Sequence, residues 1–305
     1  MSLALRAFAW RRVHSDFLII FNWHQVTPLF DPLRHHRHTW TELKHFETQI
    51  DYLTAKFDIL PLYDAIGRLN RGVLRGSCAA LTFDDGDISI ADSVVPLLRE
   101  RNLPATFFIN SAYLEGRRSY WFPILSYLCT VENSGLQGAL PEDLKEKALH
   151  LRTTDDPIYY RAVRDHLEQL ASSVPNLGSR LVSAAWLADL DGIQFAIGAH
   201  GHEHQRFSMM PSEWQLDDLR ENVRVLSQFK AYRPIFAVPF GRPWDWTAET
   251  IRIARGQGLE VVLSNGGINV GTSDFYQRIP SDGRTIRYLV TAAMSDALTK
   301  QRFSV

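Results

Sequence analysis

Short apolar runs alternate with amphipathic helical patterns along most of this chain, and the alternation limits the folds open to it. Strands are predicted at residues 17–21, 79–83, 105–109, 194–197, 235–238 and 259–263. Apolar residues recur at helical spacing in segments 43–53, 63–69, 88–101, 183–190, 212–226, 247–255 and 286–300. Because parallel strands need a long crossover between them, repeated strand–helix units predict an α/β fold with a parallel sheet.

The carboxyl ends of parallel strands are where α/β folds gather their functional sites. Closure of about seven such units into a barrel would bring these ends together. The length of 305 residues allows one large domain or two smaller ones. Two patterns, Thr39-x-x-Glu42 and Ser212-x-x-Gln215, are typical of a capping box and predict helix starts.

The rhythm changes between about residues 115 and 181, where the pattern is mostly helical. Helices are predicted at 121–128, 142–151 and 157–171. Since these segments keep periodic apolar residues, we interpret the stretch as a helical insertion and not as a linker.

One apolar strand runs directly into two adjacent carboxylates, Asp84 and Asp85, followed by Gly86. Neighbouring carboxylates repel each other, so a cation that binds between them stabilises both. The alternative is an Asx turn in which Gly86 supplies a positive φ. The placement after a strand favours a functional site. Asp87 is a further possible ligand, although its position favours a cap for the helix that follows.

A second cluster, residues 200–204, also follows a predicted strand. His200 and His204 are four residues apart, so one turn or tight loop would place both imidazoles beside one cation. We expect His202 to lie in a second layer or to face solvent. Glu203 does not form the HExxH motif of metalloproteases, because His204 follows it at once. The other cluster, at 35–38, has no carboxylate nearby in sequence and is interpreted as a solvated loop.

The overall composition narrows the function classes. A net charge of −1 gives no reason to expect nucleic acid or an anionic membrane as a partner. Cys78 and Cys129 lack CxxC spacing, which favours buried free thiols over a disulfide framework. The apolar run 17–21 is too short to span a bilayer, and no signal peptide is evident. We therefore expect a cytoplasmic location, with association at the membrane face as an additional option.

Several motifs in the same order resemble the polysaccharide deacetylases, the NodB-homology group of carbohydrate esterase family 4. Residues 82–86, Thr-Phe-Asp-Asp-Gly, are similar to the family's first motif. Residues 200–204 resemble its second motif, His-(Ser/Thr)-x-x-His, with Gly201 in place of the hydroxyl residue. Segments 104–108 and 236–241 also fall where that family has similar sequences. The likeness extends from about residue 17 to about 280.

The resemblance implies a distorted (β/α)7 barrel of the NodB-homology type, with residues 1–305 as a single catalytic domain and the helical insertion at about 115–181. It also implies site residues, namely Asp85, His200 and His204 as metal ligands, Asp84 as general base, and Pro239, Phe240 and Gly241 as part of the substrate groove. The implied cofactor is a divalent metal ion, usually zinc, with Co²⁺ or Ni²⁺ as alternatives.

Two departures from the family pattern concern the catalytic groups. The family usually has an arginine in its third motif that holds the base, but Ala237 or a neighbour occupies that region here, and Arg206 or Arg242 are the candidates to replace it. The family's late Leu-x-His motif, the source of the general acid, has no counterpart, since no histidine follows His204. Our candidate for the acid is His24, which comes just after the first strand. Deacetylases of the poly-N-acetylglucosamine type similarly carry a Tyr-His at this point. The alternative for His24 is a structural role.

We therefore expect a metal-dependent hydrolase that removes N-acetyl groups from an N-acetylated sugar or polysaccharide during glycan synthesis or modification. A second hypothesis keeps the metal site but takes a non-sugar C–N amide as substrate. A third is a catalytically impaired barrel that only binds glycan. The missing arginine and late histidine favour this third hypothesis, while the presence of Asp84, Asp85, His200 and His204 opposes it.

Overall fold

Seven parallel strands close into a barrel in the computed structural model, which describes residues 16–114, 120–122, 156–173, 178–289 and 291. The ring consists of β1 (Phe17–Trp23), β10 (Tyr276–Pro280), β9 (Glu260–Leu263), β8 (Tyr232–Ala237), β7 (Phe195–Ala199), β6 (Ala105–Ile109) and β5 (Ser77–Phe83). Pairing of β1 with β5 along its full length, from Phe17 opposite Ser77 to Trp23 opposite Phe83, closes the ring. This confirms the predicted (β/α)7 barrel.

The strands are buried on both faces, which explains why they read as continuous apolar runs in the sequence. On β1, Phe17, Ile19 and Phe21 pack in a cluster with the surrounding helices, while Leu18 and Ile20 pack in a second cluster with Phe108 of β6 and Ala237 of β8. This second cluster lies inside the barrel. The alternation places even-numbered residues of β1 and β5 inward, and it continues to Asn22, Thr82 and Asp84 at the strand ends.

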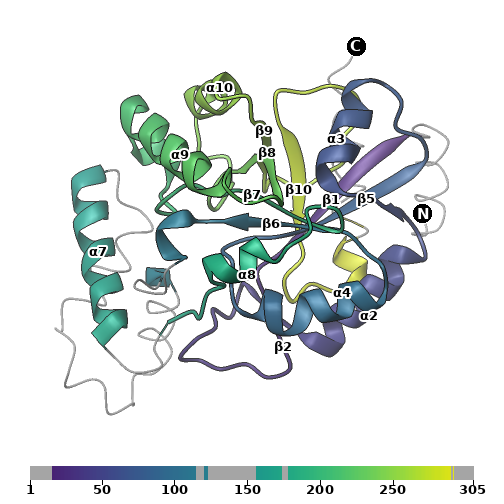
Figure 1. Ribbon diagram of the computed structural model, residues 1–305, viewed down its shortest axis with the longest axis horizontal. Helices are drawn as coiled ribbons and strands as arrows, with labels where there is room; N and C mark the ends of the chain where they lie inside the picture. The colour runs from purple at the N-terminus through teal and green to yellow at the C-terminus, as the bar shows by residue number, and fades with distance from the viewer. Residues whose placement is uncertain (1–15, 115–119, 123–155, 174–177, 290, 292–305) are drawn as a thin grey trace.

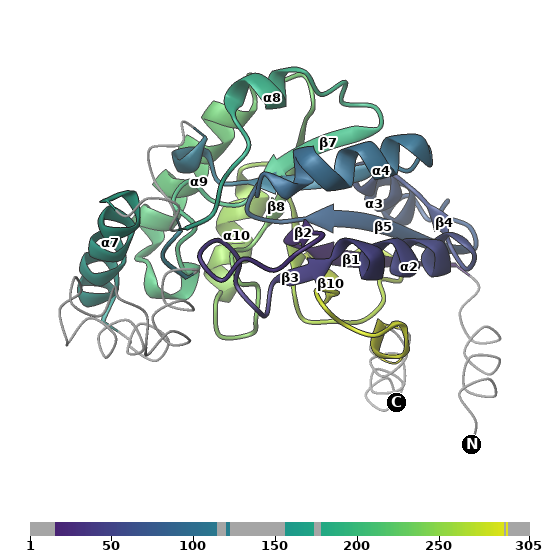
Figure 2. The ribbon, with the colours of Figure 1, turned by 90° about the horizontal axis from the view of Figure 1, so that it is seen from below.

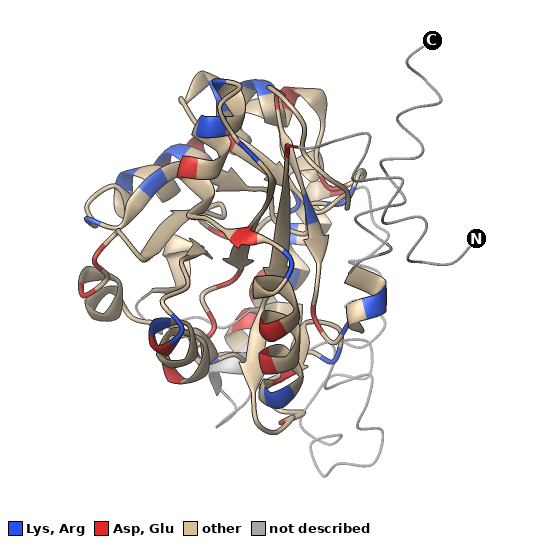
Figure 3. Ribbon diagram, turned by 90° about the vertical axis from the view of Figure 1, so that its right-hand side faces the viewer, with Lys and Arg blue, Asp and Glu red and all other residues tan. Residues whose placement is uncertain are grey.

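The helices cover the outside of the barrel, as Figures 1 and 2 show. They are α2 (Leu43–Thr54), α3 (Leu62–Asn70), α4 (Val95–Glu100), α8 (Ala184–Ala188), α9 (Ser212–Leu226) and α10 (Ala248–Gly256). α9 contacts α10. α3 is the exception to the outer layer, because it contacts β1, β5 and β8 at the amino end of the barrel and adds its apolar residues to the inner cluster. Basic and acidic residues are interspersed over the helices on the side of the molecule drawn in Figure 3.

Shorter elements complete the described chain. A separate two-stranded parallel sheet joins β2 (Gln25–Thr27) and β3 (Trp40–Glu42), and β4 (Asp58–Ile59) pairs with the start of β5. The predicted helix at 88–101 is a π-helical turn, Ile90–Val94, that continues into α4. Pro96 lies in the first turn of α4, directly after the π-helical turn.

Both predicted capping boxes are wrong. Residues 40–42 form β3, and α2 begins after Glu42 without a side-chain cap. At α9 the N-cap is Pro211, and Gln215 instead donates to the carbonyl of Met210 and accepts from the hydroxyl of Thr250. Among the described helices, α10 does begin with a capping box, which Thr247 forms with Thr250. The side chain of Gln215, which the pattern at Ser212 assigned to a local cap, is thus used in these other hydrogen bonds.

The sequence prediction also missed β10, a short strand that contains a proline and two polar residues. Within the predicted insertion, the helix at 157–171 is present as α7 (Pro157–Ser173), at the edge of the molecule in Figure 1. The other two predicted helices of that stretch lie outside the described residues, apart from positions 121 and 122, and so does Cys129. Cys78 is a buried free thiol, as predicted. None of the described helices has the length and apolar character needed to cross a bilayer.

Close packing inside the barrel makes Gly198 of β7 difficult to replace. A Cβ at this position would lie 2.6 Å from a ring carbon of Phe108 and 2.9 Å from the carbonyl oxygen of Ile235. We predict that Gly198→Ala lowers the free energy of unfolding by about 1–3 kcal/mol, because the inner cluster would be overpacked. Urea denaturation measures this loss. Gly256→Ala in α10 is the matched control, since no atom lies within 4 Å of the added methyl, and it should leave stability equal or slightly higher. Equal losses in the two variants would contradict the packing argument.

Candidate metal centre and active site

The predicted site residues meet at the carboxyl ends of the barrel strands. Asp84 and Asp85 follow β5, His200 follows β7, and His204 is four residues further along the same loop. The parallel barrel aims all of these strands at one end, so residues 115 positions apart in sequence come into contact. All four side chains are at least nine-tenths buried.

Asp85, His200 and His204 converge on one point. The Nε2 atoms of His200 and His204 lie 3.3 Å and 3.2 Å from Oδ1 of Asp85, and one ligand atom from each residue falls within 4.8 Å of the others. His200 is oriented by its second nitrogen, since Nδ1 lies 2.8 Å from the carbonyl oxygen of Ala237. Donation from Nδ1 to that carbonyl leaves the lone pair of Nε2 pointing into the site.

These three residues fit a divalent cation. Oδ1 of Asp85 is buried against the two imidazoles, and neither contact has the geometry of a hydrogen bond. A cation between these atoms would compensate the buried carboxylate charge. Two imidazoles and one carboxylate are a donor set that zinc and other first-row metals accept. Burial alone would raise the pKa of Asp85, but His204 and His200 hold it well below its usual range, so the carboxylate is ionised. The arrangement can therefore hold a metal ion.

Backbone strain is concentrated at this site. Among the described residues, four that are not glycine have positive φ, and three of them are Asp85 (69°), His204 (49°) and Phe240 (60°). Each such conformation costs about 1–3 kcal/mol and persists only where the surrounding structure enforces it. The left-handed turn at Asp85 lets two consecutive carboxylates reach one cleft instead of opposite faces of the strand.

The position of Gly201 has no room for the hydroxyl residue that stands there in the motif it resembles. Its φ of 74° is left-handed, and a Cβ would lie 2.9 Å from Oδ1 of Asp218. That carboxylate accepts hydrogen bonds from the backbone N–H groups of His202 and Glu203, so it has little room to move. Serine or threonine at this position would collide with the residue that holds the loop.

Asp84 is held by a buried arginine that the sequence analysis missed. Arg278, on β10, donates from Nη1 to Oδ1 (2.7 Å) and from Nη2 to Oδ2 (2.9 Å), and its side chain is fully buried. Asn22 of β1 adds a third bond to Asp84 Oδ2 at 3.0 Å. The proposed substitutes Arg206 and Arg242 are wrong, because Arg206 pairs with Asp245 and Arg242 lies over Trp244. The signal available in the sequence was weak, because β10 is only five residues long and Gln277 precedes Arg278.

The pairing controls the charge of Asp84. Burial by itself would raise its pKa, but the Arg278 guanidinium, with smaller contributions from His200 and His24, lowers the pKa below its usual value. Asp84 is thus a carboxylate at neutral pH and can accept a proton. Its Oδ2 lies 3.8 Å from Nε2 of His200, beside the candidate metal ligands.

His24 faces the same cleft, as its position after β1 predicted. Its Nε2 is 3.8 Å from Oδ2 of Asp84, and its Nδ1 is 2.6 Å from Oδ2 of Asp282. The backbone N–H of His24 also donates to Asp282 Oδ1, so one carboxylate orients both the ring and the chain. Although burial would lower it, the pKa of His24 is raised to about 9 by Asp282 and the two aspartates of the site. Asp282, two residues after β10, was not predicted.

The remaining predicted residues lie around this centre. The ring of Phe240 is 4.7 Å from that of His204, and Pro239 and Gly241 flank it on the loop after β8. Tyr120 and Phe122, inside the predicted insertion, also place their rings 5.4 Å and 5.3 Å from His204. Aromatic side chains thus surround one ligand.

The secondary candidates have other roles. Asp87 accepts from the N–H of Ser89 at the start of the next helical turn, as a capping residue does, and it is not among the converging ligands. Nδ1 of His202 lies 2.9 Å from the hydroxyl of Ser111. The 35–38 segment is a loop, but His35 in it is buried, so the interpretation as solvated is wrong for that residue.

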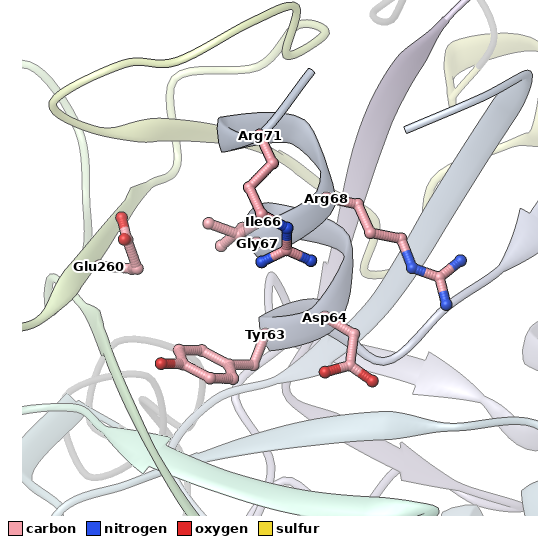
Figure 4. Close-up of a pocket in the computed structure, with 7 residues that line it drawn as sticks. All are labelled: Tyr63, Asp64, Ile66, Gly67, Arg68, Arg71 and Glu260. Atoms are coloured by element: carbon pink, nitrogen blue, oxygen red, sulfur yellow. The ribbon is translucent and has the colours of Figure 1, made fainter. Parts of the chain in front are cut away.

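A separate pocket lies away from this centre. It is lined by Tyr63, Asp64, Ile66, Gly67, Arg68 and Arg71 of the α3 region and by Glu260 (Figure 4). Since Glu260 opens β9, the pocket is at the amino end of the barrel, opposite the carboxyl ends that carry the aspartates. It shares no residue with the candidate metal centre.

Removal of Arg278 should leave Asp84 as a buried charge without a cation. We predict that Arg278→Met lowers the free energy of unfolding of the metal-free protein by about 3–5 kcal/mol at neutral pH. In the wild type the lowered pKa of Asp84 contributes stability above the unfolded pKa, and this contribution is lost as the pH falls through the folded pKa. In the variant the pKa of Asp84 is raised instead. The difference in the free energy of unfolding between wild type and variant should therefore shrink as falling pH protonates Asp84.

Urea titrations between pH 5 and pH 7.5 measure this gap. Arg252→Met is the matched control, because Arg252 pairs with Glu249 on the exposed surface of α10 and should contribute nothing measurable. A gap independent of pH would show that Arg278 acts through packing and not through its charge.

Comparison with known proteins agrees with the observed fold. A sequence model of the polysaccharide deacetylase family matches residues 71–146, which contain Asp84 and Asp85. A comparison with curated protein sequences gives no match.

Three solved structures share the fold at low sequence identity. They are the Streptococcus pyogenes deacetylase PplD in complex with acetate (15% identity, TM-score 0.58, 92% of this chain and 100% of that chain covered), IcaB from Ammonifex degensii (17%, 0.58, 92% and 99%) and a de-N-acetylase from Aggregatibacter actinomycetemcomitans (12%, 0.62, 91% and 100%). The family match and the shared barrel together confirm that this chain resembles the polysaccharide deacetylases.

Proposed function

We propose that this protein is a metal-dependent hydrolase that removes N-acetyl groups from an N-acetylated sugar or polysaccharide, with residues 1–305 as one catalytic domain and about 115–181 as a helical insertion. The observation that carries the proposal is the convergence of Asp85, His200 and His204 on one point, where a buried carboxylate oxygen lies against both imidazoles. Asp84 and His24 lie beside that point. A de-N-acetylase and an acetate-bound deacetylase among the similar structures support an N-acetyl substrate.

The five side chains supply the groups that amide hydrolysis needs. Asp85, His200 and His204 would hold a divalent ion, for which zinc is our first choice and Co²⁺ or Ni²⁺ the alternatives. Such an ion, when bound, supplies Lewis-acid chemistry that polarises the amide carbonyl and lowers the pKa of the attacking water. Asp84, kept ionised by Arg278, accepts the proton of that water.

His24 would complete the reaction as general acid. Its raised pKa keeps the imidazole protonated at neutral pH, so it can give a proton to the nitrogen of the departing amine. The C–N bond breaks as the proton arrives, and the products are acetate and a free amine. Asp282 holds the ring through Nδ1, which leaves Nε2 to face the cleft. Pro239, Phe240 and Gly241 would form part of the groove for the sugar.

Two other functions use the same barrel. A non-sugar amide substrate would keep every step above, and only a substrate screen separates it. The glycan-binding hypothesis rested on the missing arginine and late histidine. Arg278 pairs with Asp84, the proposed general base, and His24 lies in the cleft beside it. Both contacts favour a catalytic barrel over one that only binds glycan.

The metal requirement and the role of Asp84 can be tested together. Protein stripped of metal should release no acetate from N-acetylated oligosaccharides, and zinc, cobalt or nickel should restore release. Asp84→Asn should lower kcat by about 10²–10⁴-fold, the range expected for loss of a general base, and it should still show a metal-induced rise in Tm. Asp85→Asn, which removes a ligand instead, should lose both. Acetate release that does not depend on metal would contradict the proposal.

The role of His24 has a pH signature. His24→Gln should lower kcat by about 10²–10⁴-fold while metal binding persists. A general acid works below its pKa, so kcat of the wild type should fall as the pH rises toward about 9. A bound cation repels the imidazolium and lowers the pKa of His24, so the fall in kcat should occur at or below that pH. Asp282→Asn removes the main group that raises the pKa of His24. The fall in kcat at alkaline pH should therefore move to lower pH in this variant. An unchanged kcat in His24→Gln would make its role structural.

A further inference from the structure

An arginine on α7 is buried against the loop that carries the candidate metal ligands. The side chain of Arg164 is only 1% exposed, and Nη2 donates to Oε2 of Glu203 at 3.0 Å and to Oδ1 of Asp165 at 2.7 Å. Nε lies 4.0 Å from Glu168 on the same helix. Burial of a guanidinium is unfavourable unless its charge is paired, so these contacts hold α7 against Glu203.

Glu203 is the residue directly before His204. The backbone on both sides of it is constrained, since its N–H donates to Asp218 and the residue after it has a left-handed φ of 49°. A second link to α7 comes from Tyr113, whose hydroxyl lies 2.6 Å from Oε1 of Glu168 and 3.2 Å from the carbonyl oxygen of Glu203. Both the side chain and the main chain of Glu203 are therefore connected to α7.

The two candidate histidine ligands are oriented in different ways. His200 has an acceptor for its second nitrogen in the carbonyl of Ala237. Nδ1 of His204 is buried and makes no hydrogen bond with the described residues. Metal-binding histidines almost always have such a partner, and its loss typically weakens metal binding 10- to 100-fold. His204 must therefore be oriented through its ring contacts and through its own backbone, which Glu203 anchors.

We propose that Arg164 is a positioning residue for the metal centre, and that α7 of the helical insertion orients His204 through the buried Arg164–Glu203 pair. This inference rests on the metal site of the proposed function. It assigns α7 a fixed structural role beside the ligands instead of that of a lid. By linkage, metal binding and the docking of α7 stabilise each other.

Co²⁺ titration of the full chain, followed by its visible absorption, tests the proposal without an activity assay. Arg164→Gln and Glu203→Gln should each weaken Co²⁺ binding by about 10- to 100-fold. Because both act through one pair, the double variant should bind no more weakly than the weaker single variant. Glu203 is 19% exposed, so Glu203→Gln keeps the test decisive if Arg164→Gln does not fold.

Arg252→Gln is the matched control. Arg252 pairs with Glu249 on the exposed surface of α10, away from α7 and from the ligand loop, so its replacement should leave Co²⁺ affinity within about twofold of wild type. In the wild type, Co²⁺ should also slow amide hydrogen exchange in α7, and this effect should be lost in Glu203→Gln. Unchanged affinity in both charge variants, or equal weakening by Arg252→Gln, would overturn the positioning role. Failure of the wild type to bind Co²⁺ would instead overturn the metal site itself, and with it the proposed function.

Discussion

The pair between Asp84 and Arg278 is the interaction on which the candidate site depends. It lies inside the barrel, where an unpaired charge would be strongly unfavourable, and it is satisfied by two parallel hydrogen bonds. The pair also crosses the seam of the barrel, because β1 stands between β5 and β10 and contributes Asn22 to the same network. Closure of the ring brings Arg278 beside Asp84, and this contact keeps the Asp84 carboxylate ionised.

Around this pair, the structure maintains strained backbone at the residues that would bind metal. Asp85 and His204 have left-handed φ values, and the loop between His200 and His204 is held by hydrogen bonds from buried polar side chains. Asp218 accepts from two of its N–H groups, Asn222 accepts from the N–H of His200, and Asn110 donates to the carbonyls of His200 and Gly201. The strain is sustained by these contacts, and it directs the ligand atoms toward one point.

The departures from the family sequence pattern have a spatial explanation. An arginine beside Asp84 and an imidazole in the cleft are both present, but they come from β10 and from the residue after β1. In a closed parallel barrel the ends of all strands surround the same space, so a group can be supplied from any of them. A side chain at the carboxyl end of any strand can therefore reach the site, whatever its place in the order of motifs.

The sequence alone determined the alternation of strands and helices, and with it the parallel barrel and the end at which the site lies. It also determined the candidate ligands, because carboxylates and imidazoles directly after apolar strands are visible as patterns. It did not indicate β10, Arg278 or Asp282, since a short strand with polar residues resembles a loop until its neighbours bury it. Only the tertiary structure decided which arginine pairs with Asp84, why Gly201 replaces a hydroxyl residue and how α7 meets Glu203. The physical reason is that local patterns report on local backbone, whereas the pairing of buried charges depends on which chain segments the closed barrel brings together.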